Sequence, residues 1–143
     1  MPQASRTIDV QVGAERLFHV LSDYQVYPSF LSEMRRVETL EVRGHEKTVR
    51  FELLLFKVEV VYILRLLEEP YRRISWKLLE SNWLNSVNGE WRIETPSREK
   101  CRLTYKLEIG IKGLVPRIVS TQLSTFYLPA MLEHFKERAE QFR

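Results

Sequence analysis

Cysteine is almost absent from this sequence, and so are long apolar runs. Cys101 is the one cysteine among 143 residues, which excludes an internal disulfide and a thiolate zinc cage and is consistent with a reducing compartment. The longest apolar runs, such as Val60–Leu64, are far shorter than the roughly 20 residues that cross a bilayer. The opening residues 1–10 also lack the apolar core of a secretory signal. We therefore expect a soluble, cytoplasmic protein.

The sequence also has little excess charge of either sign. Its 22 Lys and Arg against 19 Asp and Glu leave a net charge of +3, which by itself does not predict a nucleic-acid or membrane partner, and DNA binding is not expected. No stretch has the low-apolar, high-charge composition of a disordered tail or linker, and no repeat occurs. A length of 143 residues therefore predicts a single domain over residues 1–143, built on one core.

Residue patterns for common catalytic chemistry are missing as well. The three histidines, His19, His45 and His134, lie far apart and show no metal-ligand spacing, so no metal site is expected. The sequence contains no G-x-S-x-G motif, no glycine-rich phosphate loop and no catalytic Cys/His signature. Hydrolase and nucleotide chemistry are therefore disfavoured, and no cofactor is expected to be required.

The first part of the chain changes from a strand pattern to a helical one. From Ile8 to Val12 apolar and polar residues alternate, which predicts a half-buried strand. After Gly13 the apolar residues recur at helical spacing up to Tyr24, which predicts a short helix. Pro28 suits the first turn of a second short helix, which is expected to end near Met34.

Strand patterns then follow one another as far as residue 109. Residues 47–55 and 58–66 each place apolar side chains on one face and charged ones on the other, with Phe56–Lys57 as a tight turn between them. Three further alternating segments are centred on Trp76, Trp91 and Tyr105. The separators, at residues 43–46, 69–72, 80–82 and 95–99, are short and rich in turn formers, which predicts an antiparallel meander with one apolar face.

The last predicted element is the longest. Gly110 and Gly113 interrupt the last strand, and residues 116–142 are predicted to form a helix of about 27 residues with a bend at Pro129. Only this helix is long enough to cover the apolar face of a sheet of about seven strands, so we expect the strands to curl around it. The predicted fold class is α+β: a curved antiparallel sheet, with two short helices after its first strand, wrapped around a long C-terminal helix.

Several segments of the chain resemble a known family. In order, they are SRTIDV, DYQVYPSFL, FELLLFKVEVVYILR, RRISWKL, NGEWRIE and LEHFKERAEQF. With the order of elements, they resemble the polyketide cyclase/dehydrase and coenzyme-Q-binding branch of the START-like (SRPBCC, Bet v 1-like) superfamily over nearly the whole chain. The opening MPQASRT also resembles bacterial ribosome-association toxins of this branch. The more specific pieces are the spacing of Asp23, Tyr27, Pro28 and Phe30, the Gly89-x-Trp91 pair, and Phe135 before Arg138-Ala139-Glu140.

The resemblance implies a helix-grip fold with a deep cavity between the sheet and the long helix, in which relatives hold ubiquinone, other lipids or polyketide intermediates. We predict that this protein binds or transports such a hydrophobic molecule without catalysis, and that tyrosine hydroxyls are available to a quinone carbonyl. The alternation by itself is equally compatible with a solid core, because it predicts which side chains face inward and not whether they enclose a cavity. The predicted wall consists of Phe51, Tyr62, Trp76, Leu78, Tyr105, Leu123, Phe126 and Tyr127.

Two other functions stay open. A polyketide aromatase or cyclase would fold a reactive chain in such a cavity, but the predicted inward faces carry almost no titratable group beyond tyrosines. A module that contacts the ribosome or a membrane surface is suggested by the opening residues and by basic clusters at Arg35–Arg36, Arg72–Arg73 and Arg98–Arg102. A solvated sheet exterior explains these clusters as well.

Three conspicuous residues have structural explanations. Asp23 is expected to fix a turn through backbone hydrogen bonds rather than act as an acid. Gly89 is expected to mark a bend and close packing within a strand, with the indole of Trp91 filling the space. Trp83 is expected to cover the core, or alternatively to guard the mouth of a cavity.

Overall fold

The computed structural model describes residues 3–55, 57–111, 113 and 128–141 of the chain. The helices are α1 (Ala14–Ser22), the short 3-10 helix η1 (Tyr24–Ser29) and α3 (Leu128–Glu140). The strands are β1 (Gln3–Val10), β2 (Met34–Arg43), β3 (Glu46–Leu55), β4 (Val58–Glu69), β5 (Arg73–Ser81), β6 (Leu84–Ser97) and β7 (Lys100–Ile111).

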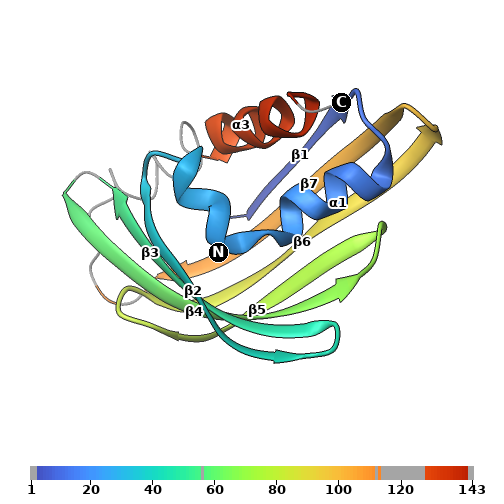
Figure 1. Cartoon of the computed structure of the whole chain (residues 1–143). Helices are drawn as coiled ribbons and strands as arrows, with labels where there is room; N and C mark the ends of the chain where they lie inside the picture. Colours follow the sequence, from blue (N-terminus) through green and yellow to red (C-terminus); the bar gives the residue numbers. More distant parts are fainter. Residues whose placement is uncertain (1–2, 56, 112, 114–127, 142–143) are drawn as a thin grey trace.

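The strands form one seven-stranded antiparallel sheet in the order β1-β7-β6-β5-β4-β3-β2. Each strand from β2 to β7 pairs with its neighbour along the chain, and β1 pairs with β7 at the far edge. The sheet is strongly curved, and α1 and α3 lie on its concave side (Figure 1). The predicted fold class, a curved antiparallel sheet with a C-terminal helix against it, is thus confirmed.

The concave face is apolar because the alternation seen in the sequence points the same residues inward on every strand. In β3, Val49, Phe51, Leu53 and Leu55 are buried, and β4 continues this face from Val60 to Leu66. Strand β2 begins at Met34, which pairs with Leu53 of β3. The central strands therefore present one continuous hydrophobic surface to the helices.

The second short helix differs from its prediction. It is a 3-10 helix that begins at Tyr24, and Pro28 is near its end rather than in its first turn. The carbonyl of Tyr27 then accepts hydrogen bonds from the amides of Phe30 and Leu31, which closes the helix before β2 starts at Met34. The prediction of a helix from Pro28 to Met34 was therefore wrong. The helix starts about one turn earlier, because the side chains of Tyr24 and Tyr27 make buried hydrogen bonds.

Helix α3 presents a stripe of buried residues to the sheet: Met131, Leu132, Phe135 and Ala139. Two contacts tie its last turns to the end of β1. Lys136 Nζ donates to the carbonyl of Asp9 at 2.7 Å, and Glu140 Oε2 accepts from the Gln11 amide at 2.8 Å. Residues 116–127 of the predicted helix lie outside the described residues, so the bend expected at Pro129 stays a prediction.

The predicted turns join the strands, with two shifts of boundary. Gly44 and Tyr71 lie in their predicted turns with φ of 61° and 66°. Strand β5 runs through Ser81, so its turn consists of Asn82–Trp83, and β6 runs to Ser97 before its own turn. Phe56 of the predicted Phe56–Lys57 turn is outside the described residues.

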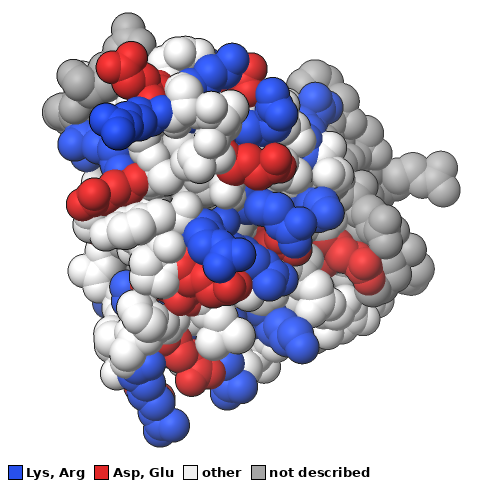
Figure 2. Space-filling view, turned by 90° about the vertical axis from the view of Figure 1, so that its right-hand side faces the viewer, with Lys and Arg blue, Asp and Glu red and all other residues white. Residues whose placement is uncertain are grey.

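The basic clusters lie among acidic side chains. Arg73 contacts Glu69 at 3.5 Å and Glu90 at 3.4 Å, and both Lys100 and Arg102 lie within 4 Å of Asp9. On the face shown in Figure 2, basic and acidic residues are interspersed rather than separated. This pattern agrees with a solvated sheet exterior, where surface ion pairs contribute little to stability.

Candidate functional site

A cavity of about 140 Å³ lies between the concave face of the sheet and the helices. An engineered apolar cavity of about 150 Å³ stays dry and binds benzene, so this cavity has room for about one six-membered ring. Its lining comes from η1, from every strand between β2 and β7, and from α3. The lining residues are Tyr27, Leu31, Met34, Phe51, Leu53, Leu55, Val58, Val60, Tyr62, Leu64, Trp76, Trp83, Leu84, Val87, Trp91, Tyr105, Leu107, Ile109, Ile111, Met131 and Phe135.

Aromatic rings hold one side of this cavity together. Phe135 of α3 packs edge-on against Tyr27 of η1 at 5.0 Å and against Trp91 of β6 at 5.1 Å between ring centroids. Phe51 and Tyr62, on neighbouring strands, stack at 5.1 Å with an angle of 13° between the rings. Such pairs restrict one another's rotamers, so this part of the wall is shaped in advance.

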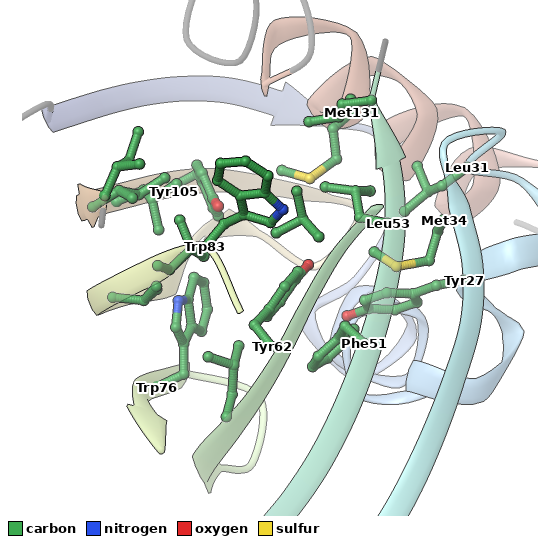
Figure 3. Close-up of a pocket in the computed structure, with 18 of the residues that line it drawn as sticks. Tyr27, Leu31, Met34, Phe51, Leu53, Tyr62, Trp76, Trp83, Tyr105 and Met131 are labelled. Atoms are coloured by element: carbon green, nitrogen blue, oxygen red, sulfur yellow. The ribbon is translucent and has the colours of Figure 1, made fainter. Parts of the chain in front are cut away.

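Among the described lining residues, the polar side-chain atoms belong to phenols, indoles and thioethers. The Tyr27 hydroxyl donates to the carbonyl of Leu21, whereas the Tyr62 hydroxyl points into the cavity (Figure 3). Burial raises the pKa of Tyr62 well above its ordinary value, and burial together with the nearby Tyr62 raises the pKa of Tyr105. Both phenols therefore stay protonated, as hydrogen-bond donors, far above neutral pH.

A glycine allows one indole to form part of the wall. Gly89 of β6 is paired with Trp76 of β5, and a Cβ atom at Gly89 would lie 2.6 Å from three atoms of the Trp76 indole. The bare backbone of Gly89 thus lets the ring lie directly on the neighbouring strand. Close packing at Gly89 is confirmed, although the ring against it belongs to Trp76 and not to Trp91.

A buried polar cluster lies behind the aromatic wall. Glu68, on the inward face of β4, is only 8% exposed. Its Oε2 accepts a hydrogen bond from the Tyr24 hydroxyl at 2.6 Å and lies 3.0 Å from Lys47 Nζ. Burial, the neighbouring Tyr27 and the bond to Glu68 raise the pKa of Tyr24. Since Tyr24 packs edge-on against Tyr27 and Phe51, the cluster fixes η1 against the sheet.

Loss of the Tyr24 hydroxyl is expected to loosen this attachment. Tyr24→Phe removes a charge-assisted hydrogen bond in a buried site, so the free energy of unfolding should fall by about 1.5–2 kcal/mol in urea denaturation. The exposed Tyr71→Phe serves as the matched control and should change it by less than about 0.5 kcal/mol. In a Glu68→Leu background Tyr24→Phe should cost much less; an equal cost in both backgrounds would contradict the assignment.

The predicted wall residues divide into three groups. Phe51, Tyr62, Trp76 and Tyr105 all line the cavity. Leu78 is half-buried beside a register shift between β4 and β5 and is not among the described residues that line the cavity. The predicted wall residues Leu123, Phe126 and Tyr127 lie outside the described residues.

Other contributors were not predicted as wall. Tyr27, Leu31 and Met34 reach the cavity from η1 and the start of β2, and Met131 and Phe135 reach it from α3 (Figure 3). Trp83, for which cover of the core and a place at the cavity mouth were both open, is part of the lining. Glu68 was overlooked, although it continues the inward series of Leu64 and Leu66 by one more step of two.

Within the described residues, no group of three or more His, Cys, Asp or Glu side chains could hold a metal ion. Cys101 is buried, which raises the pKa of its thiol. None of the described helices is long and apolar enough to span a membrane.

Sequence comparison connects this architecture to known proteins. The family described as "Polyketide cyclase / dehydrase and lipid transport" matches residues 10–136. The chain belongs to this family. Across 141 residues, 99% of the chain, this family member is 23% identical to the ribosome association toxin RatA of Escherichia coli, 89% of which is covered. The persistence and stress-resistance toxin PasT of the same species is 22% identical over the same coverage.

Solved structures of other proteins show the same fold. A START superfamily protein from Mycobacterium smegmatis superposes with a TM-score of 0.86 at 19% identity, with 99% of each chain covered. An aromatase/cyclase from a Streptomyces species superposes with a TM-score of 0.73 at 23% identity, with 98% of this chain and 87% of the other covered. At these identities the likeness extends to the fold and not to the ligand.

Proposed function

We propose that this protein binds and carries a neutral hydrophobic small molecule, of the ubiquinone, lipid or polyketide type, in the cavity under α3, without catalysing a reaction on it. One observation carries this proposal: the cavity is the size of one ring, and the described side chains that line it offer hydroxyl donors but no charge. No resident cofactor is part of the proposal. A cytoplasmic location is part of it, supported by the single buried cysteine.

The lining favours a neutral ligand that carries a hydrogen-bond acceptor. An ionised carboxylate would lose its hydration without meeting a positive partner among the described lining residues, which is strongly unfavourable. A ketone or quinone carbonyl, in contrast, can accept from the Tyr62 or Tyr105 hydroxyl at little cost. The aromatic rings of the wall provide flat surfaces for the ring that bears the carbonyl.

The size of the cavity divides such a ligand into two parts. One ring fits within the described walls, so an isoprenoid or acyl tail must extend beyond them. Each buried methylene contributes about 0.8 kcal/mol, so ten buried tail carbons would add roughly 8 kcal/mol before ordering costs. The ring and its carbonyl would then provide orientation, and the tail would provide most of the affinity.

Quinone binding should be directly visible in tryptophan fluorescence. All three tryptophans of the chain, Trp76, Trp83 and Trp91, line the cavity, so a quinone bound there should quench all of them. Titration with a short-chain ubiquinone should give saturable quenching. Tyr62→Phe should weaken the affinity roughly threefold to tenfold, because one hydrogen bond is lost, while Tyr71→Phe, at an exposed tyrosine outside the cavity lining, should leave it unchanged.

Organic extraction of the purified protein followed by mass spectrometry tests the proposal without a chosen ligand. A stoichiometric hydrophobic molecule would support it and would identify the class. If extraction finds no such molecule, and titrations with quinones, fatty acids and polyketide-like aromatics all fail to saturate, the carrier function is wrong.

A polyketide aromatase or cyclase is the second candidate, favoured by the likeness to the Streptomyces aromatase/cyclase. In this case the phenols would orient a poly-β-ketone and exchange protons with it. Incubation with a polyketide chain, followed by analysis for ring-closed products, distinguishes the candidates. Turnover that Tyr62→Phe or Tyr105→Phe abolishes would favour the enzyme over the carrier.

A ribosome-binding module is the third candidate, favoured by the relatives named for toxin activity. The interspersed charges on the face shown in Figure 2 argue for weak electrostatic binding at most on that face. Co-sedimentation with ribosomes over a range of salt concentrations tests it. Absence of binding at low salt would remove this candidate.

A further inference from the structure

The turn between β5 and β6 is attached to the neighbouring strand β4 through two side chains. The Ser81 hydroxyl donates to the carbonyl of Val61 at 2.6 Å and accepts from the amide of Trp83 at 3.3 Å. The Asn82 carboxamide bonds to β4 twice: its Oδ1 accepts from the Val61 amide and its Nδ2 donates to the carbonyl of Glu59, each at 2.9 Å. These bonds hold the turn in one conformation before any ligand binds.

The anchored turn places Trp83 in the wall of the apolar cavity, close to Tyr62. Trp83 is half-buried and is one of the described residues that line the cavity. Tyr62 pairs with Ser81 across β4 and β5, and its neighbour Val61 is the residue to which the turn is bonded. In Figure 3 the hydroxyl of Tyr62 and the indole nitrogen of Trp83 both point into the cavity. The same backbone contacts therefore position both polar groups.

The polar groups of this cavity are mostly hydrogen-bond donors. Three of the described lining side chains are indoles, which donate and cannot accept, and three are phenols: Trp76, Trp83, Trp91, Tyr27, Tyr62 and Tyr105. Neither the hydroxyls of Tyr62 and Tyr105 nor the indole N–H of Trp83 has a hydrogen-bond partner among the described residues. Tyr105 is 6% exposed, so bulk water does not serve it. Thioethers, at Met34 and Met131, accept weakly, and the ligand must therefore supply the acceptors.

An excess of donors distinguishes a carbonyl from a hydroxyl group on the ligand ring. A carbonyl oxygen has two lone pairs, so it can accept from the Tyr62 hydroxyl and from the Trp83 indole together. A ligand hydroxyl in the same place brings a further hydrogen, and a phenol that accepts this hydrogen must direct its own hydrogen to another acceptor. A buried donor left without a partner costs more free energy than an ordinary hydrogen bond contributes. The ring with carbonyl oxygens is therefore the better ligand.

We propose that Trp83, together with Tyr62, determines the specificity of the cavity by selecting a ring that bears carbonyl oxygens over the same ring with hydroxyl groups. For a quinone, this means that the oxidised form binds more tightly than the quinol. Trp83 makes the distinction, because its indole N–H donates and never accepts, whereas a phenol can do either. This inference rests on the proposed ligand-carrying function and adds to it which chemical form of the ligand is carried.

Anaerobic equilibrium dialysis with a short-chain ubiquinone and with its ubiquinol tests this selection on the full chain. The wild-type protein should bind the quinone at least about fivefold more tightly, because the quinol leaves a buried donor unpaired. Trp83→Phe keeps an aromatic ring but removes the N–H, so the ratio should fall below about twofold, whatever the added space does to both affinities. Leu79→Ala, at an exposed residue of β5 outside the described lining, should leave the ratio unchanged.

A pair of ligands that does not exchange electrons provides an independent measurement. Acetophenone and 1-phenylethanol share one phenyl ring and differ in a carbonyl against a hydroxyl group. In nuclear magnetic resonance titrations of the wild-type protein, acetophenone should shift the indole Nε1–Hε1 signal of Trp83 along a saturating curve, and 1-phenylethanol should shift it less. This titration decides the question if circular dichroism shows that Trp83→Phe does not fold, and equal shifts would contradict the selection.

The outcomes separate this inference from the carrier function on which it rests. Quinone and quinol binding with equal affinity, or a preference that persists unchanged in folded Trp83→Phe, overturns the role of Trp83 and leaves the carrier function intact. Saturable binding of fatty acids but of neither quinone form also overturns the inference alone. If none of these hydrophobic ligands binds saturably, the carrier function fails and the inference fails with it.

Discussion

Truncation of Phe135 to alanine is expected to lower the free energy of unfolding by about 3–5 kcal/mol, the largest effect of any single change considered for this chain. Phe135 is 1% exposed, and its ring contacts Tyr27, Phe30 and Trp91 at centroid distances of 5.0–5.1 Å. The variant loses the transfer free energy of a phenyl ring and leaves a void between α3 and the sheet. Urea denaturation followed by circular dichroism measures the loss.

The same change separates packing from surface effects. Leu40→Ala, at a residue of β2 that is 45% exposed, removes apolar atoms without opening a void and should cost no more than about 0.5 kcal/mol. Because Phe135 also lines the cavity, the variant should bind a bulkier ring better relative to a small one. A loss below about 1 kcal/mol would mean that α3 does not anchor the core at this point.

Substitution of Gly89 by alanine is expected to cost about 3 kcal/mol, the upper part of the usual range for overpacking. The added methyl group would lie 2.6 Å from three atoms of the Trp76 indole. The indole is a rigid double ring and cannot move aside as the end of a flexible side chain can. Its ring must therefore move off the backbone of Gly89 and shift toward the cavity. Thermal or urea denaturation should show the loss, and the variant should also bind ligand more weakly.

A double-mutant cycle tests the assigned cause. In a Trp76→Phe background the ring is smaller, so Gly89→Ala should cost less than about 1 kcal/mol. If the cost remains the same with phenylalanine at position 76, contact with the indole does not explain it. The tryptophan emission spectrum provides a second readout: Gly89→Ala should change it in the wild-type background, and should change it little in the Trp76→Phe background, where the displaced indole is absent.

Much of the sheet could be predicted because its signals are local. The alternation of residues along β3 and β4 determines the strands and their inward face, and the short polar separators determine the turns. Both signals depend only on residues a few positions apart. Prediction failed where a distant contact overrides a local preference. Pro28 suits the start of a helix, yet the bond from Tyr24 to Glu68, 44 residues away, begins the helix earlier.

The candidate site was predicted less completely for the same reason. Alternation from Trp76 places Leu78 inward, and Leu78 does pair with the buried Leu64, yet it is absent from the described lining. Tyr27 lies on a short helix whose inward direction depends on the sheet that it covers. No local pattern contains such information.

The sequence by itself determined the fold class, the apolar inner face and the family, since alternation, turn formers and family-specific segments are all properties of neighbouring residues. Tertiary structure alone decided that the face borders a cavity, that Glu68 is buried with Tyr24 and Lys47, and that Trp83 enters the cavity wall from a turn bonded to β4. A void or a cluster depends on how side chains from distant segments pack in space, and periodicity along the chain does not record this.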